Sequence, residues 1–169
     1  MAARAHDHEL RLAAKRALRR PAVQLTGLQA RAVGRGFARY FADSGVAVWG
    51  CAILPDHVHL VIGRASIDVE QVVVQLKGAA TESLRNEELH PFAAAVSVGK
   101  RPPKCFARSG WNVFLEPDDV LRAIRYVQQN PLKEGKPAQH WKFVTVYEPK
   151  AALDVALRCA SRLNARRKK

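Results

Sequence analysis

The segment HVHLVIG, residues 57 to 63, carries two histidines separated by a single apolar residue. If this segment is a strand, its side chains alternate between the two faces of the sheet, so His57 and His59 share one face and the apolar residues occupy the other. Two imidazoles on one face can hold one divalent cation. The same pattern also arises from paired surface histidines or from a hydrogen-bonded core histidine. The two histidines are therefore candidate metal ligands.

A second group of polar side chains lies in the segment IRYVQQNP, residues 124 to 131. In a helix, residues four apart lie on one face, so Tyr126 and Asn130 project together, with Gln129 beside them. A phenol and an amide oxygen on one face are suited to act as a nucleophile and a metal ligand. A tyrosine on an amphipathic helix is also commonly a core anchor, and Asn before Pro is an ordinary helix end.

Two other tyrosines compete for the role of nucleophile. Tyr40 lies in an aromatic run with Phe37 and Phe41 that is typical of a core. Tyr147 lies in WKFVTVYEP, with no candidate metal ligand one helical turn away. We expect both to be structural.

The elements around the histidines can be predicted from local signals. VAVWGCAI, residues 46 to 53, and HVHLVIG are β-rich runs separated by Leu54-Pro55-Asp56, which predicts neighbouring antiparallel strands. A helix is predicted from the N-cap Thr26 to Ser44-Gly45, although glycines inside it weaken its helix preference. Asp68 is a suitable N-cap for a second helix, whose apolar residues recur at helical spacing: Val69, Val72, Val73, Leu76, Ala80 and Leu84.

The second half of the chain contains weaker signals. Residues 90 to 110 hold three prolines and two glycines and are expected to form a loop, and Trp111 to Leu115 is expected to be a short strand. Pro117 fits the first turn of a helix that we expect to end at Asn130, because Pro131 follows. This order of elements predicts an α+β fold, one antiparallel sheet with helices packed on it in a ferredoxin-like arrangement. We expect residues 1–20 to be a basic extension, 21–148 a single domain and 149–169 a basic tail.

The net charge is +13, from 28 Lys plus Arg against 15 Asp plus Glu. Such a surplus favours a nucleic acid partner because neutralising phosphates releases condensed counterions, although a basic surface also serves solubility. Trp111 is a candidate to stack on a base, and it fits equally well as a core anchor. The candidate phosphate contacts, each of which also fits an ordinary solvated surface, are Lys77, Arg85, Arg108, Lys133 and Lys136.

The sequence indicates a cytoplasmic protein, associated with the nucleoid if it is prokaryotic. No run approaches the roughly 18 apolar residues of a membrane span, and the N-terminal segment lacks the apolar stretch of a secretory signal. The three cysteines, Cys51, Cys105 and Cys159, are widely spaced, so we expect free thiols.

Four segments together resemble the single-tyrosine HUH transposases, and most of all their REP-associated tyrosine transposase branch. The similarity covers about residues 46 to 145, and the segments are ILPDHVHLVI (53–62), QLKGAATESL (75–84), WNVFL (111–115) and RAIRYVQQNPLKEG (122–135). The resemblance implies the HUH endonuclease fold, which is ferredoxin-like or RRM-like, and cleavage of single-stranded or hairpin DNA through a 5′-phosphotyrosine. It also implies that Tyr126 is the nucleophile and that His57, His59 and Asn130 bind the metal ion. Mg²⁺ prefers oxygen ligands and Mn²⁺ accepts imidazole, so we expect either to support activity.

Two alternatives remain at this stage. One is a domesticated nucleic-acid-binding protein that keeps the fold and the basic surface but does not cut. The other is a zinc hydrolase that uses His57 and His59 with His90 or His140, and it ranks last because the sequence shows no carboxylate at ligand spacing. Both a monomer and a homodimer are compatible with the sequence.

Overall fold

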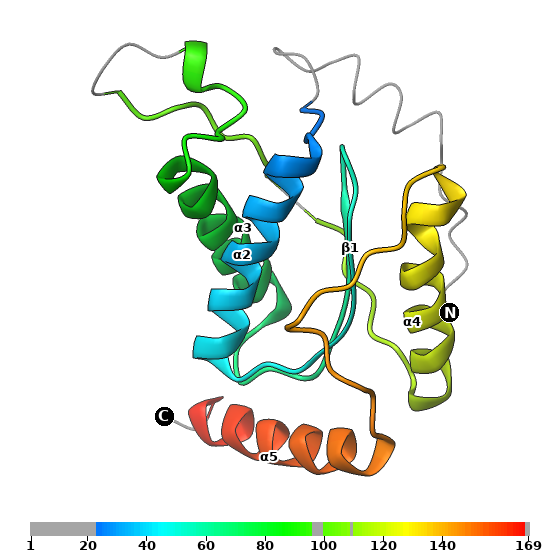
Figure 1. The fold of residues 1–169 in the computed structure, drawn as a ribbon. Helices are drawn as coiled ribbons and strands as arrows, with labels where there is room; N and C mark the ends of the chain where they lie inside the picture. The colour runs from blue at the N-terminus through cyan, green and yellow to red at the C-terminus, as the bar shows by residue number, and fades with distance from the viewer. Residues whose placement is uncertain (1–22, 96–99, 109, 168–169) are drawn as a thin grey trace.

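The computed structural model describes residues 23–95, 100–108 and 110–167, so the predicted N-terminal extension lies outside the described residues (Figure 1). The fold is α+β. A two-stranded antiparallel sheet has helices α2 and α3 on one side and α4 on the other, and α5 crosses one end of these layers (Figure 1). The elements are α2 (Gly27–Ser44), β1 (Val48–Ile53), β2 (Val58–Ile62), α3 (Val69–Asn86), the 3₁₀ turn η1 (Ala93–Ala95), α4 (Pro117–Lys133) and α5 (Pro149–Arg167).

The two strands form the hairpin that the sequence predicts. Ala52 of β1 lies opposite His59 of β2, and Ile53 lies opposite Val58. The Leu54 N–H donates to the His57 carbonyl over 2.8 Å and closes the connection. The prediction of adjacent antiparallel strands is therefore confirmed, and the hairpin fixes the backbone on which both histidines are carried.

Helix α2 begins and ends where its capping residues predict. The Gln29 N–H donates to the Thr26 hydroxyl over 3.3 Å, and the Gln29 side chain accepts from the Thr26 N–H over 2.9 Å. Gly45 ends the helix with φ +66° and donates its N–H to the Phe41 carbonyl. Because both ends of α2 are capped by local residues, its position along the chain follows from the sequence alone.

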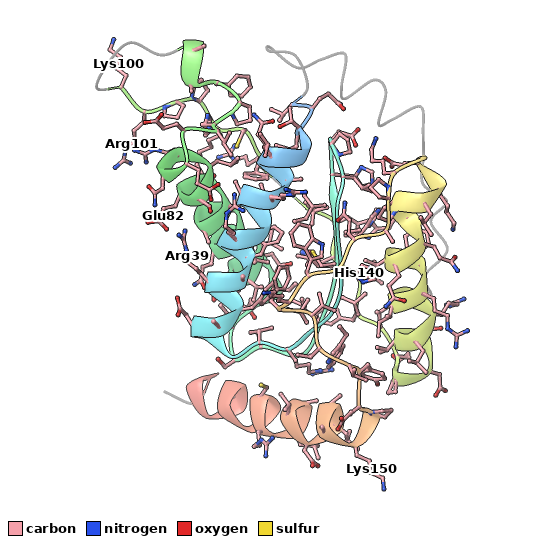
Figure 2. All side chains as sticks on the ribbon, in the orientation of Figure 1. Arg39, Glu82, Lys100, Arg101, His140 and Lys150 are labelled. Atoms are coloured by element: carbon pink, nitrogen blue, oxygen red, sulfur yellow. The ribbon has the colours of Figure 1, made fainter. Side chains whose placement is uncertain are left out.

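Helix α3 packs on α2 through the predicted apolar stripe. Four of its residues, Val72, Leu76, Ala80 and Leu84, are buried in one cluster with side chains of α2 and β1. At the exposed edge of this interface, Arg39 of α2 pairs with Glu82 of α3 over 3.3 Å, and Figure 2 shows the two side chains facing each other. The stripe thus forms the core on the side of the sheet away from α4.

Close packing explains why α2 contains glycines, although glycine is unfavourable inside a helix. A Cβ built on Gly36 would lie 2.5 Å from the Ala79 carbonyl oxygen of α3, and one on Gly34 would lie 2.2 Å from the Trp141 ring. Contacts this short are steric overlaps with backbone and a large ring. Only glycine therefore allows α2 to approach both neighbours.

We expect Gly36→Ala to lower the free energy of unfolding by about 1–3 kcal/mol, because the added methyl group pushes α2 and α3 apart. Gly78→Ala on α3 is the matched control, since a Cβ there meets nothing within 4 Å. It should raise stability by up to about 1 kcal/mol, through helix propensity alone. Urea unfolding followed by circular dichroism measures both values, and equal effects of the two substitutions would contradict the packing argument.

Two predictions about elements are wrong. Residues 111 to 115 have no strand structure, and most of their apolar side chains are exposed, Phe114 to 83%. The segment has β-forming residues, but the described structure gives it no backbone partner, and a strand requires one. Helix α4 also does not end at Asn130: it continues through Pro131 to Lys133. Pro131 loses one helical hydrogen bond, but its ring is buried, and the Glu134 and Gly135 N–H groups donate to Asn130, Pro131 and Leu132 carbonyls.

The edge of β1 that faces away from β2 is covered by the segment between α4 and α5. The Gln139 side chain accepts from the Ile53 N–H and donates to the Ile53 carbonyl, each over 2.8 Å. Six residues later, the Thr145 N–H donates to the Val48 carbonyl over 2.7 Å. Residues 139 to 145 therefore satisfy backbone groups at both ends of the strand.

The other predictions concern cysteines and membrane spans. Cys51, Cys105 and Cys159 are free thiols, as expected, and burial raises the pKa of Cys51 far above that of an exposed thiol. No helix among the described residues combines the length and the apolar composition needed to cross a bilayer. The predicted tail from residue 149 contains α5, whose Leu153 and Leu157 are exposed.

Candidate active site

The structure brings the two histidines and the candidate tyrosine into one row. The ring centres of His57 and His59 are 4.8 Å apart, and those of His59 and Tyr126 are 5.5 Å apart. His57 directly precedes β2, His59 lies in β2, and Tyr126 comes from α4, which packs on both strands. The convergence expected from an H-x-H strand and a later helix is thus present in the described fold.

A neighbouring carboxylate sets the orientation of His57. The Asp56 Oδ1 lies 2.6 Å from the His57 Nδ1. An ionised carboxylate can only accept, so the shared hydrogen is carried by Nδ1, and in the neutral ring Nε2 keeps its lone pair. Carboxylates that hold a histidine in this way are a common second layer around protein-bound metals. The arrangement fits a metal-binding role for His57 Nε2.

One face of α4 presents Tyr126, Asn130 and Glu134 at intervals of four residues. Tyr126 is 46% exposed, whereas Asn130 is buried with 7% exposed. Glu134, the C-cap of the helix, places its Oε1 3.8 Å from the His57 Nε2. The helix face therefore contributes a phenol, an amide and a carboxylate to the same side of the sheet.

Sequence reasoning missed Glu134. The signal is visible in the sequence, because Glu134 lies two helical turns after Tyr126. A helix that ends at Asn130, as the sequence predicts, would not bring Glu134 to this face. The carboxylate that faces His57 Nε2 thus comes from the C-cap of a helix that continues through a proline.

The predicted DNA contacts lie in different environments. Lys133 places its Nζ 5.1 Å from the centre of the Tyr126 ring, and Lys136 follows in the next turn of chain. Arg85 comes from the last turn of α3, on the opposite side of the sheet, and Arg108 is exposed in the segment after it. Only Lys133 has a described contact with the candidate nucleophile.

Lys77 and Trp111 line a cavity of about 460 Å³ between α3, β2 and residues 105–107 and 110–115. The Lys77 Nζ donates to the Ala107 carbonyl over 3.0 Å, and burial lowers its pKa. Trp111 is 61% exposed, which is compatible with stacking on a base and not with a core anchor. Asp56 and His57 also line this cavity, so it reaches the row of rings.

The competing tyrosines make aromatic packing contacts. The Tyr40 ring lies edge-on to Phe41 at 5.4 Å, and burial raises its pKa. The Tyr147 ring lies edge-on to Trp49 at 4.7 Å. A raised pKa makes a phenol harder to ionise, so the Tyr40 hydroxyl is a poorer nucleophile than that of an ordinary exposed tyrosine.

The alternative zinc site gains no support. Within the described ranges, no group of three or more His, Cys, Asp or Glu side chains has the geometry to hold a metal ion. His90 is buried beyond the end of α3, where its Nδ1 accepts from the Phe92 N–H. His140 is exposed on the segment between α4 and α5 (Figure 2). The metal site that the sequence predicts contains two imidazoles and the Asn130 amide. It is not a group of this kind, because an amide is not among these four types of side chain.

His90 makes stability depend on pH. Burial and the nearby charge of Arg85 lower its pKa in the folded protein, so the unfolded chain takes up a proton first as the pH falls. Stability is therefore complete above about pH 6.5, the unperturbed value, and is lost below it. Urea unfolding at about pH 7.5 and about pH 5.5 should show a smaller loss for His90→Gln than for the wild type. The exposed control His140→Gln should lose as much as the wild type, and an equal loss in all three proteins would contradict the prediction.

Comparisons of the chain with known protein families, with curated proteins and with solved structures find no match. The functional interpretation therefore depends on the side chains and on their arrangement.

Proposed function

We propose that this protein is a metal-dependent endonuclease and strand transferase that acts on single-stranded or hairpin DNA, in the manner of the single-tyrosine HUH transposases. The observation that carries the proposal is the row formed by His57, His59 and Tyr126. A cation-binding pair next to a half-exposed phenol is what this reaction requires. The antiparallel hairpin with helices on both sides is compatible with the ferredoxin-like core of that group.

In the proposed reaction, the Tyr126 phenol oxygen attacks a backbone phosphorus and the bond to the 3′ oxygen breaks. The phenolic proton passes to solvent, and the leaving oxygen takes up a proton and departs as a 3′-OH. The 5′ phosphate stays on the tyrosine. Attack by a 3′-OH on this phosphotyrosine releases the phenol and rejoins the strand, with no external energy source because the number of phosphoester bonds is conserved.

The residues fit a divalent cation, Mg²⁺ or Mn²⁺. His57 is oriented by Asp56, His59 lies beside it, and Asn130 adds an amide oxygen from the buried face of α4. A bound cation would offset the negative charge of the scissile phosphate and so favour attack by the phenol oxygen.

The charge of the protein supports a DNA partner. The net charge of +13 favours phosphate binding that weakens with salt, and Lys133 places one ammonium beside the nucleophile. The other basic candidates would bind more distant phosphates.

A covalent trapping assay tests the proposal. The full-length protein is incubated with Mn²⁺ and 5′- or 3′-labelled hairpin and single-stranded oligonucleotides, and the products are separated on a denaturing gel. A protein–DNA adduct that carries the label from the 3′ side of the cut supports the proposal, because the 5′ phosphate remains on the tyrosine. Salt-dependent binding with no adduct or cleavage on any substrate would favour the non-cutting nucleic-acid-binding protein.

A further inference from the structure

The cavity beside β2 has mainly apolar walls. Its volume is about 460 Å³, within the range of about 300–1,000 Å³ that is common for small-molecule sites, so a nucleobase fits inside it. The apolar residues that α3 and β2 contribute to the walls include Val58, Leu60, Ile62, Val69, Val72, Val73 and Leu76. An occupant must therefore have faces that tolerate apolar contact.

A positive charge interrupts these apolar walls. Among the described residues that line the cavity, Lys77 is the only lysine or arginine. Its Nζ donates to the Ala107 carbonyl over 3.0 Å, which holds the ammonium against the segment that precedes α4. An ammonium is a donor and never an acceptor. The cavity therefore favours a ligand that has acceptor atoms on its edge as well as apolar faces.

An aromatic ring lies at the mouth of the cavity. Trp111 lines the cavity although 61% of the residue is exposed, so its indole borders both the interior and the solvent. Exposed aromatic rings are the surfaces on which the bases of single-stranded nucleic acids stack. Arg108 is exposed in the same segment and adds a second positive charge that is available to phosphate. Flat faces, acceptor edges and nearby phosphates are the features of a nucleotide.

The cavity adjoins the proposed active site. Asp56 and His57 line it, and His57 also begins the row that continues through His59 to Tyr126. A DNA strand with its scissile phosphate at this row would carry neighbouring nucleotides close to the cavity. The bases of a single strand are unpaired, so placing one of them in a pocket breaks no base pair.

We propose that this cavity binds one unpaired base of the DNA strand, guanine in preference to adenine, an inference that rests on the DNA substrate of the proposed function. The faces of the base contact the apolar walls and the Trp111 ring, and Lys77 donates to guanine O6 and N7. Guanine presents these two acceptors side by side, whereas adenine has an amino group in place of O6. The cavity thus gives the protein a sequence preference close to the cut.

DNA binding without divalent metal tests this proposal separately from cleavage. Fluorescence anisotropy measures the affinity of the full chain, in EDTA, for short labelled oligothymidylates that carry either one guanine or one adenine. The two strands have the same length and charge, so a difference in affinity reports on the base. We expect the wild type to bind the guanine strand about 10-fold more tightly, the usual scale for one base-specific contact.

Two pairs of variants locate the preference in the cavity. Val73→Phe fills part of the cavity, whereas Val74→Phe adds the same ring at a neighbouring residue that is 66% exposed and does not line it. Lys77→Met removes the charge in the cavity, and Lys150→Met removes an exposed charge at the start of α5 (Figure 2). Val73→Phe and Lys77→Met should bind both strands equally, and their controls should keep the preference. Trp111→Ala should weaken binding of both strands by about 5- to 100-fold, and circular dichroism checks that each variant is folded.

The outcomes separate this inference from the proposed function. Equal affinity of the wild type for the two strands overturns the base site, and so does a Lys77→Met variant that weakens both strands by the same factor, because that is the behaviour of a phosphate contact. Either result leaves the proposed function standing if the trapping assay yields an adduct. A guanine preference that Lys77→Met abolishes, with no adduct on any substrate, supports the base site and overturns cleavage. Absence of binding to any strand overturns both.

Discussion

Tyr126→Phe should abolish the covalent protein–DNA adduct and reduce strand cleavage by a factor of about 10³ or more, because it removes the attacking oxygen of the proposed reaction. The substitution keeps the ring and therefore the contacts with His59 and Lys133. The hydroxyl belongs to a side chain that is 46% exposed, so its loss should leave stability nearly unchanged. Denaturing gels of single-turnover reactions measure adduct and cleaved strand together, and a filter-binding assay checks that DNA binding persists.

The other two tyrosines are the matched controls for this experiment. Tyr40→Phe and Tyr147→Phe each remove one hydroxyl from rings that pack against Phe41 and Trp49. Both variants should form the adduct at the wild-type rate. An adduct that persists in Tyr126→Phe and disappears in Tyr147→Phe would move the nucleophile to the segment beside β1.

His57→Ala and His59→Ala are each expected to reduce cleavage by about 10²-fold or more, since each removes a proposed ligand of the cation that offsets phosphate charge. The double variant should be little worse than either single one, because the two residues act as a unit. Asp56→Asn should have a smaller effect, about 10- to 100-fold, because it changes the orientation and basicity of His57 and leaves the proposed ligands in place.

The dependence on metal concentration distinguishes these roles. Raising Mn²⁺ should restore cleavage in Asp56→Asn, whose ligands remain, and should not restore it in the double histidine variant. Single-turnover cleavage over a range of Mn²⁺ concentrations gives both values, with the exposed His140→Ala as the control. Full activity of His59→Ala at limiting Mn²⁺ would show that the histidines do not hold the cation.

The elements that the sequence predicts well are those with local signals. Thr26 and Gly45 define α2 by their own capping bonds, the stripe from Val72 to Leu84 defines the buried face of α3, and Pro55-Asp56 separates the two strands. Part of the candidate site follows from the same rules, because strand alternation groups His57 with His59 and the four-residue interval of a helix groups Tyr126 with Asn130. That α4 packs against the strands and brings Tyr126 beside His59 is a tertiary contact that these rules do not give.

The features that could not be predicted depend on contacts between distant segments. Gln139 binds Ile53 across 86 residues, and no local pattern indicates this pairing. Residues 111 to 115 have the composition of a strand but lack a partner, which composition does not reveal. The continuation of α4 through Pro131 depends on burial of the proline ring, and the position of Glu134 beside His57 depends on that continuation.

The cover that residues 139 to 145 form over β1 limits how the protein can assemble. A strand with open amide and carbonyl groups invites another chain to add to the sheet, which is a common route to dimers, peptide capture and aggregation. Here the amide of Ile53 and the carbonyls of Ile53 and Val48 are already engaged. Before another strand could add to this edge, residues 139 to 145 would have to separate from β1. A self-association that leaves the fold intact would instead have to use a surface other than this edge of β1.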